Sequence, residues 1–402
     1  MSQLNYLEKL LDGVEVEWKA LGEVCDFKNG FAFKSSLFKE AGLPIIRITN
    51  VDGKNISLDD LKYFDPSDYK ENTASYEISK GDILIAMSGA TTGKIGFYAH
   101  ESPAYLNQRV GKFLPKPKIL NNRYLYHYLL SKVEQIYVIA GGGAQPNLSS
   151  NALMAKIEIP IPCPDNPEKS LAIQAEIVRT LDAFTAMTAE LTAELNLRKK
   201  QYNYYRDQLL SFEEGDVEWK TLGDLAENLD SKRKPITSGL REAGEIPYYG
   251  ASGIVDYVKD YIFDGDYLLV SEDGANLLAR NTPIAFSISG KTWVNNHAHV
   301  LKFETYAERK YVEYYLNSID LTPYISGAAQ PKLNKKNLES INIPNPAPKE
   351  KERIVAILDK FDSLTCSIKD GLPREIELRQ KQYEYYRDLL LSFPKSHSHE
   401  AA

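Results

Sequence analysis

RKKQYNYYRDQLLSF at residues 198–212 returns as RQKQYEYYRDLLLSF at residues 379–393. Three shorter stretches return with it in the same order: VEWKALGEV (16–24) as VEWKTLGDL (217–225), GAQPNL (143–148) as AAQPKL (328–333), and IEIPIPCP (157–164) as INIPNPAP (341–348). The period of about 180 to 200 residues is too long for a solenoid unit. The repeat therefore indicates two duplicated domains in tandem.

The repeated ends also carry a heptad pattern, in which apolar positions alternate at spacings of four and three residues. The first seam is Ile177, Leu181, Phe184, Thr188, Leu191, Leu195, Arg198, Tyr202, Tyr205, Leu209 and Phe212. The second is Ile354, Leu358, Phe361, Thr365, Ile368, Ile376, Arg379, Tyr383, Tyr386, Leu390 and Phe393. Gly371 and Pro373 are expected to interrupt the second helix. The pattern predicts two long helices, which a rough two-fold relation between the halves would make antiparallel.

One four-residue unit is written twice in the first helix, as TAELTAEL at 188–195. Four residues add about 6 Å to a helix and turn it by about 400°, so each added unit lengthens the helix and nearly keeps its face. A continuous helix from Ile177 to Phe212 would be roughly 54 Å long. The repeat is interpreted as an adjustment of helix length between two domains.

The middles of the halves, residues 26–142 and 227–327, share only a thin skeleton. Each has a proline before an apolar pair (Pro44, Pro247), a Gly-Asp turn before an apolar strand (GDILIAM at 81–87, GDYLLVS at 265–271), and an Asn-rich strand (YLNQRV at 105–110, WVNNHAHV at 293–300). Short β-branched and aromatic runs bounded by Gly, Pro, Asn and Asp predict a mixed α/β fold with twisted, mostly antiparallel sheets.

The same features predict the domain limits. An N-terminal helix at 1–15, YLEKLLDG, resembles YRDQLLSF and is expected to complete the C-terminal helical region, as if a circular arrangement had been cut open. The further limits are 16–164 and 216–348 for the two domains that contain the variable regions, 165–215 and 349–394 for the helical regions, and 395–402 for a flexible tail.

The composition is that of a globular protein, with 43% hydrophobic and 26% charged residues among 402. No run approaches eighteen consecutive apolar residues and the start lacks a signal-peptide pattern, so a cytoplasmic protein without a membrane partner is expected. The three cysteines are far apart, which fits a reducing compartment. The net charge of −7 is uneven, since residues 20–160 hold 16 Lys or Arg against 14 Asp or Glu. This small excess is only a weak indication of a DNA surface.

Candidate catalytic signatures do not survive inspection. GATTGK at 89–94 has three residues between its glycines where a phosphate loop has four, and Ile95 follows where Ser or Thr is required. It is interpreted as a turn at the end of a strand, with Lys94 near a phosphate as a further possibility. His297 and His299 share one face of a predicted strand and are interpreted as packing or base-contacting residues. No catalytic residue and no metal ligand is predicted, and the chain is expected to be a binding protein.

Basic and amide side chains in the two variable regions are the candidate DNA contacts. Phosphate contacts are expected from Lys28, Lys34, Arg47, Lys94, Arg109, Lys232, Arg233, Lys234, Arg241 and Arg280. Base contacts are expected from Asn107, Gln108, Asn295, Asn296 and His297, and the recurring Gln145 and Gln330 are further candidates. The alternative for each is an ordinary solvated charge, a strand-edge amide or a fixed Gln-Pro loop.

IPIPCPDNPEKSLAIQAEIVRTLD, the TAEL-containing helix after it, and GLPREIELRQKQYEYYRDLLLSF near the end resemble the specificity subunit of type I restriction-modification enzymes, most closely the type IC branch. The resemblance covers nearly the whole chain. The resemblance lies in the sequence itself in the helices, whereas the variable regions resemble the family only in their expected fold.

The resemblance implies a non-catalytic subunit whose two recognition domains each read one half of a bipartite DNA target. It implies that the helices bind two methyltransferase subunits, which methylate adenine with S-adenosylmethionine, and through them motor-nuclease subunits that use ATP and Mg. It also implies that the number of TAEL units follows the length of the spacer between half-sites. The chain itself is expected to bind no cofactor.

Leu191, Leu195, Tyr202, Tyr204, Tyr205, Tyr383, Tyr385 and Tyr386 are the candidate partner-binding and spacer residues. These tyrosines exceed what a two-helix seam needs and suit the docking of a further helix, although they can also simply fill the coiled coil. Two alternatives stay open: a two-domain DNA-binding scaffold or regulator without methyltransferase partners, and a nucleotide-dependent enzyme built around GATTGK.

Overall fold

The computed structural model describes residues 14–143, 146–213, 215–327, 330–365 and 371–393. The chain divides into two compact units. Unit 1 comprises residues 1–190 and 376–402, and unit 2 comprises residues 191–375. The first division falls inside TAELTAEL, so each unit contains part of the long helix. The predicted N-terminal helix and tail lie outside the described residues except for residues 14 and 15.

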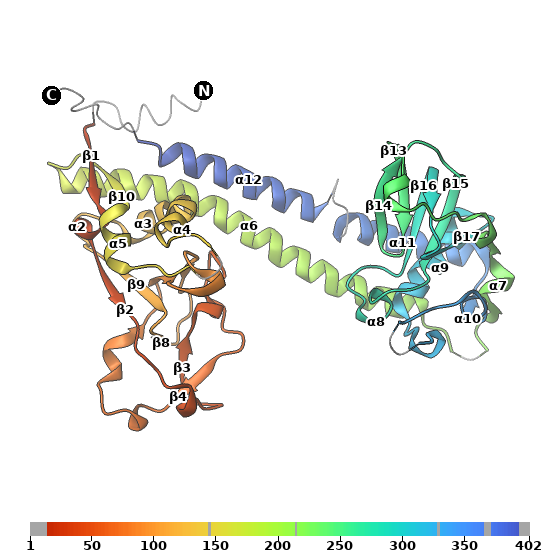
Figure 1. Cartoon of the computed structure of the whole chain (residues 1–402), viewed down its shortest axis with the longest axis horizontal. Helices are drawn as coiled ribbons and strands as arrows, with labels where there is room; N and C mark the ends of the chain where they lie inside the picture. The colour runs from red at the N-terminus through yellow and green to blue at the C-terminus, as the bar shows by residue number, and fades with distance from the viewer. Residues whose placement is uncertain (1–13, 144–145, 214, 328–329, 366–370, 394–402) are drawn as a thin grey trace. The chain divides into compact units, whose positions relative to one another are not determined.

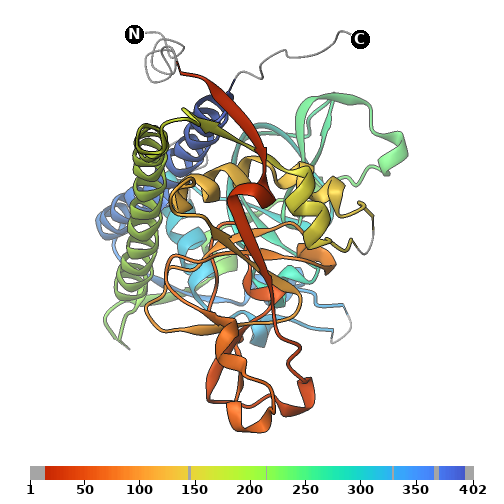
Figure 2. The ribbon, with the colours of Figure 1, turned by 90° about the vertical axis from the view of Figure 1, so that its left-hand side faces the viewer.

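Unit 1 contains three small sheets and several short helices (Figures 1 and 2). The sheets have the strand orders β1-β10, β2-β9-β6-β7 and β4-β3-β8-β5. Its strands are β1 (Val16–Ala20), β2 (Cys25–Asn29), β3 (Leu43–Ile46), β4 (Lys62–Phe64), β5 (Glu77–Ile78), β6 (Ile83–Ala86), β7 (Ile95–Phe97), β8 (Ala104–Leu106), β9 (Val110–Pro115) and β10 (Glu158–Pro162). Its shorter helices are α2 (Leu21–Val24), α3 (Asn122–Ser131), α4 (Val133–Ile139) and α5 (Ser150–Lys156).

Unit 2 joins the corresponding strands into one six-stranded sheet, β12-β17-β15-β16-β13-β14, beside the pair β11-β18. Its strands are β11 (Glu218–Thr221), β12 (Glu227–Asn228), β13 (Ala243–Gly250), β14 (Gly253–Val258), β15 (Phe263–Ser271), β16 (Ala285–Val294), β17 (Ala298–Lys302) and β18 (Asn342–Asn345). Its shorter helices are α7 (Leu222–Leu225), α8 (Asn276–Ala279), α9 (Tyr306–Ser318) and α10 (Lys335–Glu339). The long β16 pairs with β15 along one part and with β13 along another. In unit 1 two short strands take these places, since β7 pairs with β6 and β8 pairs with β3.

Repeated sequences form the same strand pair in each unit. In unit 1, β1 and β10 pair antiparallel with Trp18 opposite Pro160, and in unit 2, β11 and β18 pair with Trp219 opposite Pro344. The parallel contacts also recur, between β3 and β8 and between β13 and β16. All other strand pairs between the described strands are antiparallel. The predicted mixed α/β class with mostly antiparallel sheets is confirmed.

One helix in each unit packs on the sheet and supplies part of the hydrophobic core, α3 in unit 1 and α9 in unit 2. Asn121 caps α3 by accepting hydrogen bonds from the amides of Arg123 and Tyr124, and Thr305 caps α9 through the amide of Glu308. Leu125 and Leu129 of α3 are fully buried in the core that contains Ile83 and Ile85 of β6. Burying an aliphatic side chain of this size contributes about 1.5–3 kcal/mol. In unit 2, Leu268 and Val270 of β15 share a core with Tyr311 and Leu316 of α9. The apolar strand after each Gly-Asp turn is therefore part of the central core of its domain.

The long helices follow the predicted heptad pattern with small corrections. α6 (Pro167–Leu210) is one helix of 44 residues, which ends two residues before Phe212. α11 (Pro348–Thr365) and α12 (Leu372–Leu390) are separate helices, so the predicted interruption at Gly371 and Pro373 is confirmed. Gly371 has φ +95°, and a Cβ there would lie 2.5 Å from the carbonyl oxygen of Ser363. Ile368 lies outside the described residues.

Each unit closes the seam with one stacked aromatic pair. Phe184 of α6 stacks on Tyr386 of α12 in unit 1, with ring centroids 5.0 Å apart. Tyr205 of α6 stacks on Phe361 of α11 in unit 2, at 5.7 Å. Phe184 corresponds to Phe361 in the repeat, and Tyr205 corresponds to Tyr386. Each stack therefore joins the phenylalanine of one repeat to the tyrosine of the other. A helix segment of one repeat thus packs on a helix segment of the other within each unit.

Candidate nucleic-acid interface

Three loops of unit 1 converge beyond the end of β6. The amide of Met87 donates to the carbonyl of Arg109 at 2.8 Å, and the amide of Leu148 donates to the carbonyl of Met87 at 2.7 Å. The amide of Gly89 donates to the carbonyl of Pro146 at 3.3 Å. We call the loops 87–94, 107–109 and 146–148 edge 1.

Unit 2 repeats these bonds beyond the end of β15. The amide of Glu272 donates to the carbonyl of His297 at 2.9 Å, and the amide of Leu333 donates to the carbonyl of Glu272 at 2.8 Å. The amide of Gly274 donates to the carbonyl of Pro331 at 3.3 Å. We call the loops 272–276, 295–297 and 330–333 edge 2. The shared bonds fix the residue equivalence between the edges.

An asparagine turned inward shapes the middle loop of each edge. Asn295 is 6% exposed, and its Oδ1 accepts the amide hydrogen of His297 at 2.8 Å. Asn107 is half-buried, and its Oδ1 lies 3.4 Å from the amide nitrogen of Arg109. Both side chains therefore hold the loop. The exposed positions of these loops are Gln108 and Arg109 in edge 1, and Asn296 and His297 in edge 2.

An ionic network with largely buried carboxylates lies behind edge 2. The guanidinium of Arg233 pairs with Glu272 at 2.6 Å and with Asp230 at 3.3 Å. Lys332 pairs with the other oxygen of Glu272 at 3.0 Å. Burial raises the pKa of the Asp230 and Glu272 carboxyls, but the hydrogen bonds from His299 and from Arg233 outweigh it, and both pKa values are lowered. The network fixes loop 330–333 onto loop 272–276.

One group among the described residues brings enough imidazole and carboxylate atoms together for a metal ion, namely Asp230, Glu272 and His299. Arg233 and Lys332 already neutralise its carboxylates. Nδ1 of His299 lies 2.6 Å from Asp230 Oδ2, and its Nε2 lies 2.7 Å from the carbonyl oxygen of Leu333. Because both ring nitrogens are bonded, His299 has an internal packing role here.

Other predicted residues of unit 1 lie apart from the hydrogen bonds that define edge 1. The ammonium of Lys28 lies 4.7 Å from the ring centre of Tyr76, and the amide of Lys34 donates to the hydroxyl of Tyr69. Arg47 pairs with Asp60 at 3.2 Å. Lys94 follows the short helical turn of loop 87–94 and belongs to edge 1. Gln145 lies outside the described residues, directly before Pro146.

The remaining residues of unit 2 are distributed more widely. The exposed Gln330 belongs to edge 2, and Lys232 and Lys234 flank Arg233, whose side chain is 12% exposed. Arg241 pairs with Asp256 at 3.0 Å and lies over the ring of Tyr248 at 4.4 Å. Arg280 has φ +50° after α8, and burial lowers the pKa of its guanidinium although Asp320 opposes this. The DNA contacts predicted for these residues stay predictions.

Four residues of the edges were missed in the sequence: Ser88, Glu272, Asp273 and Lys332. Aligning the two Gly-Asp strands through their ends, GDILIAMSG with GDYLLVSEDG, would have indicated the first three. The backbone of Ser88 forms an isolated antiparallel β-bridge with Asn147, and the backbone of Asp273 forms the equivalent β-bridge with Lys332. Loops directly after matched central strands are therefore the first place to look for contacts.

GATTGK forms a turn and no nucleotide-binding loop. Residues Gly89–Thr91 make one 3-10 turn, and β7 follows it where a phosphate loop would begin a helix. The hydroxyl of Thr92 donates internally, to the carbonyls of Gly89 and Pro146. The interpretation as a turn at the end of a strand is confirmed.

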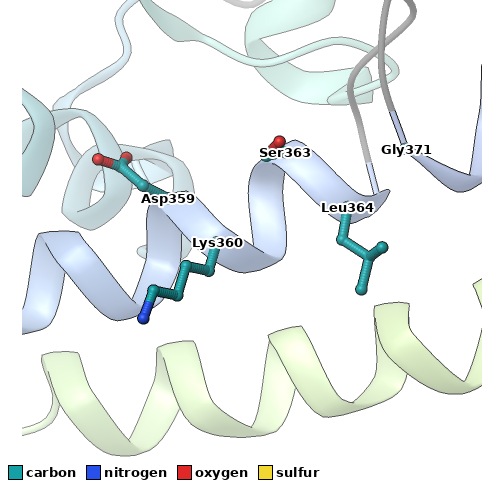
Figure 3. A pocket seen from close by; sticks show the side chains of 5 residues that line it. All are labelled: Asp359, Lys360, Ser363, Leu364 and Gly371. Atoms are coloured by element: carbon teal, nitrogen blue, oxygen red, sulfur yellow. The ribbon is translucent and has the colours of Figure 1, made fainter.

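A hollow of about 570 Å³ lies at the end of α11, lined by Asp359, Lys360, Ser363, Leu364 and Gly371 (Figure 3). Lys360 and Leu364 point toward the neighbouring segment of α6, whereas Asp359 points away from it. Asp359 accepts hydrogen bonds from the hydroxyls of Tyr306 and Tyr314. The lining of the hollow thus lacks convergent polar groups for a small molecule.

The candidate partner-binding tyrosines fall into three equivalent pairs. Tyr204 and Tyr385 are exposed, at 62% and 53%. Tyr205 and Tyr386 form the stacks with phenylalanine. Tyr383 is buried and bonds His127, and Tyr202 packs on the core of unit 2. Leu191 and Leu195 are half-buried on α6. The surface available to a partner is therefore best represented by Tyr204 and Tyr385.

The comparisons with known proteins agree on one family. A family model described as the type I restriction modification DNA specificity domain matches residues 13–198 and 214–378. The specificity subunit of the type I restriction enzyme EcoR124I/EcoR124II from Escherichia coli is 40% identical over 98% of both chains. The EcoprrI specificity subunit, also from Escherichia coli, is 36% identical over 92% of this chain and 93% of its own.

Solved structures show the same fold. The S subunit of a type I restriction-modification system from M. genitalium aligns over 96% of this chain and 98% of its own, with a TM-score of 0.61 and 17% identity. No described helix is long and apolar enough to cross a membrane. The chain belongs to the family of type I restriction-modification DNA specificity subunits.

Proposed function

We propose that unit 1 and unit 2 each read one half of a bipartite DNA target through edge 1 and edge 2. The observation that carries this proposal is the recurrence of one loop framework with different exposed side chains. Bonds between backbone groups hold the loops, so the side chains at their tips can differ without loss of the framework. Positions 108–109 and 296–297 are the central base-reading positions in this proposal, with the neighbouring basic residues on phosphates.

The helices supply docking and spacing in the same proposal. Tyr204 and Tyr385 present equivalent aromatic surfaces, one on α6 and one on α12, which suits the binding of two copies of one methyltransferase subunit. Those subunits would methylate adenine in each half-site with S-adenosylmethionine. Motor-nuclease subunits would join through them and use ATP and Mg. This chain contributes binding and spacing, and no catalytic step.

The test is a map of methylated adenines in a host that expresses this chain with its methyltransferase subunit. Replacing residues 26–142 with the segment of a relative should change one half-site, and replacing 227–327 should change the other. A third TAEL unit should lengthen the spacer alone, since it adds about 6 Å of helix. A segment replacement that altered both half-sites or neither would contradict the assignment. Binding to DNA without the methyltransferase would instead favour the scaffold or regulator.

A further inference from the structure

Edge 2 presents an accessible carboxylate where edge 1 has a serine whose hydroxyl oxygen is buried. Asp273 occupies the place of Ser88, since each bridges to the residue after the Gln-Pro pair, Lys332 or Asn147. The side chain of Asp273 is 30% exposed. Glu272 beside it is only 8% exposed and is paired with Arg233 and Lys332. Asp273 is thus the carboxylate of edge 2 that a ligand can reach.

His297 orients this carboxylate. Its Nδ1 lies 2.9 Å from both Oδ1 and Oδ2 of Asp273, and its own amide is held by Asn295. A carboxylate offers about four lone-pair sites, so one shared donor leaves acceptor sites free on both oxygens. The pair therefore presents a fixed hydrogen-bond acceptor between the loops of edge 2.

A fixed carboxylate is unfavourable against a phosphate and favourable against an amino group of a base. In the major groove, cytosine offers the N4 amino donor, and adenine offers the N6 donor beside the N7 acceptor. The N7 acceptor repels a carboxylate that approaches N6, whereas the C5–H of cytosine beside N4 does not. Lys332 pairs with Glu272 beside Asp273, and the exposed Lys232 and Lys234 flank Arg233, which also pairs with Glu272. These cations can offset the repulsion from the phosphates.

We propose that Asp273 selects a cytosine in the half-site read by unit 2, with His297 as its positioning residue. This inference rests on the proposed function, since it names one base that edge 2 recognises. It also predicts that the equivalent Ser88 imposes no such selection in the other half-site, because its hydroxyl oxygen is buried.

The experiment maps methylated sites for Asp273→Asn and Asp273→Ala in the assembled complex. The alanine variant should lose the preference for cytosine at one position by roughly 5- to 150-fold. The asparagine variant should move that preference toward adenine, because an amide can bond N6 and N7 together. The half-site of unit 1 should stay unchanged in both. Asp260→Asn removes an exposed charge of unit 2 elsewhere and should change neither half-site.

The role of His297 is tested by rescue. His297→Ala should weaken the same preference, and His297→Asn should restore part of it because an amide nitrogen can donate to Asp273. An unchanged cytosine position in Asp273→Ala, or an equal change of methylation at all sequences, would overturn the inference. In either case a bipartite map for the unsubstituted chain would leave the proposed function standing. Loss of that bipartite map in the unsubstituted chain would remove both.

Discussion

Edge 1 and edge 2 have the same backbone hydrogen bonds and nearly opposite side-chain chemistry. Where edge 1 has Met87, Ser88 and Arg109, edge 2 has Glu272, Asp273 and His297. The first set offers one exposed cationic donor, Arg109, and the second offers one accessible acceptor, the Asp273 carboxylate held by His297. Because the loops are fixed by amides and carbonyls, a duplicated domain can change what it reads while its framework stays.

The two units also differ in how they satisfy one backbone carbonyl beneath the edge. In unit 1 the amide of Gly30 donates to the carbonyl of Val110 at 3.1 Å. In unit 2 the guanidinium of Arg233 donates to the equivalent carbonyl of Ala298 at 2.8 Å. A Cβ at Gly30 would lie 2.0 Å from the carbonyl oxygen of Asn107, so unit 1 can use only close backbone packing there. Unit 2 depends on a buried charge instead.

The largest effect should therefore come from removing that charge. Arg233→Ala would leave Glu272 and Asp230 without their main cation, and breaking a buried ion pair costs about 3–5 kcal/mol. Hydrogen exchange by mass spectrometry should show loss of protection in β15 and β17, with protection of unit 1 unchanged. Arg353→Ala breaks an exposed pair with Glu350 in the same unit and should change little. Equal protection in both variants would refute the structural role of Arg233.

Edge 1 should give a smaller and more local effect. Arg109 is exposed at the position equivalent to His297, and an arginine reads guanine through O6 and N7 with two parallel bonds. Arg109→Ala should relax the preference for guanine at one position of the unit 1 half-site by about 1–3 kcal/mol, measured by binding to single-base variants of the target. Lys118→Ala removes an exposed charge from the same unit and should lower affinity equally for all variants, if at all. A uniform loss for Arg109→Ala would place it on a phosphate.

The sequence predicted the framework well because the framework is repetitive. The internal repeat showed two domains, the heptads showed the long helices, and Gly371 with Pro373 showed the break between α11 and α12. The end of α6 at Leu210 was missed by two residues, since helix ends depend on local capping. The matched strands GDILIAM and GDYLLVS lie at the centre of each domain because their apolar residues are buried by the covering helix.

The site was predicted less completely because side-chain partners are not visible in a repeat pattern. Arg233 reads as a surface cation within a basic run, yet the fold turns it onto Glu272, 39 positions later. The sequence indicates a base contact for Asn295, yet this residue is buried and its Oδ1 accepts the amide hydrogen of His297. Asp273 carries a negative charge, which indicates no phosphate contact in the sequence, although a carboxylate can select the amino group of a base.

The smallest expected effect separates the units by their response to acid. Asp182 of α6 and Asp359 of α11 are equivalent residues with different partners. Asp182 binds Arg123 and His127, and Asp359 binds the hydroxyls of Tyr306 and Tyr314. Burial lowers the pKa of His127, although its hydrogen bond to Asp182 opposes this. Burial raises the pKa of Tyr306 to about 12, so it stays neutral in acid.

A histidine with a lowered pKa in the fold takes up a proton on unfolding. Its contribution to stability is present above its ordinary pKa of 6.5 and is lost as the pH falls from there toward its lower value in the fold. Acidification from pH 7 to 5.5 should therefore weaken hydrogen-exchange protection of α3. Asp182, whose pKa is lowered to about 2 by His127 and Arg123 against the effect of burial, adds acid sensitivity only below about pH 4.

His127→Gln keeps a donor for Asp182 and cannot titrate, so the loss of α3 protection between pH 7 and 5.5 should disappear in this variant. Tyr314→Phe removes one bond to Asp359 in unit 2 and should leave that loss unchanged. If His127→Gln retained the full acid response of α3, another group would carry it. The difference between Asp182 and Asp359 would then be one of packing alone, with a titrating partner at neither site.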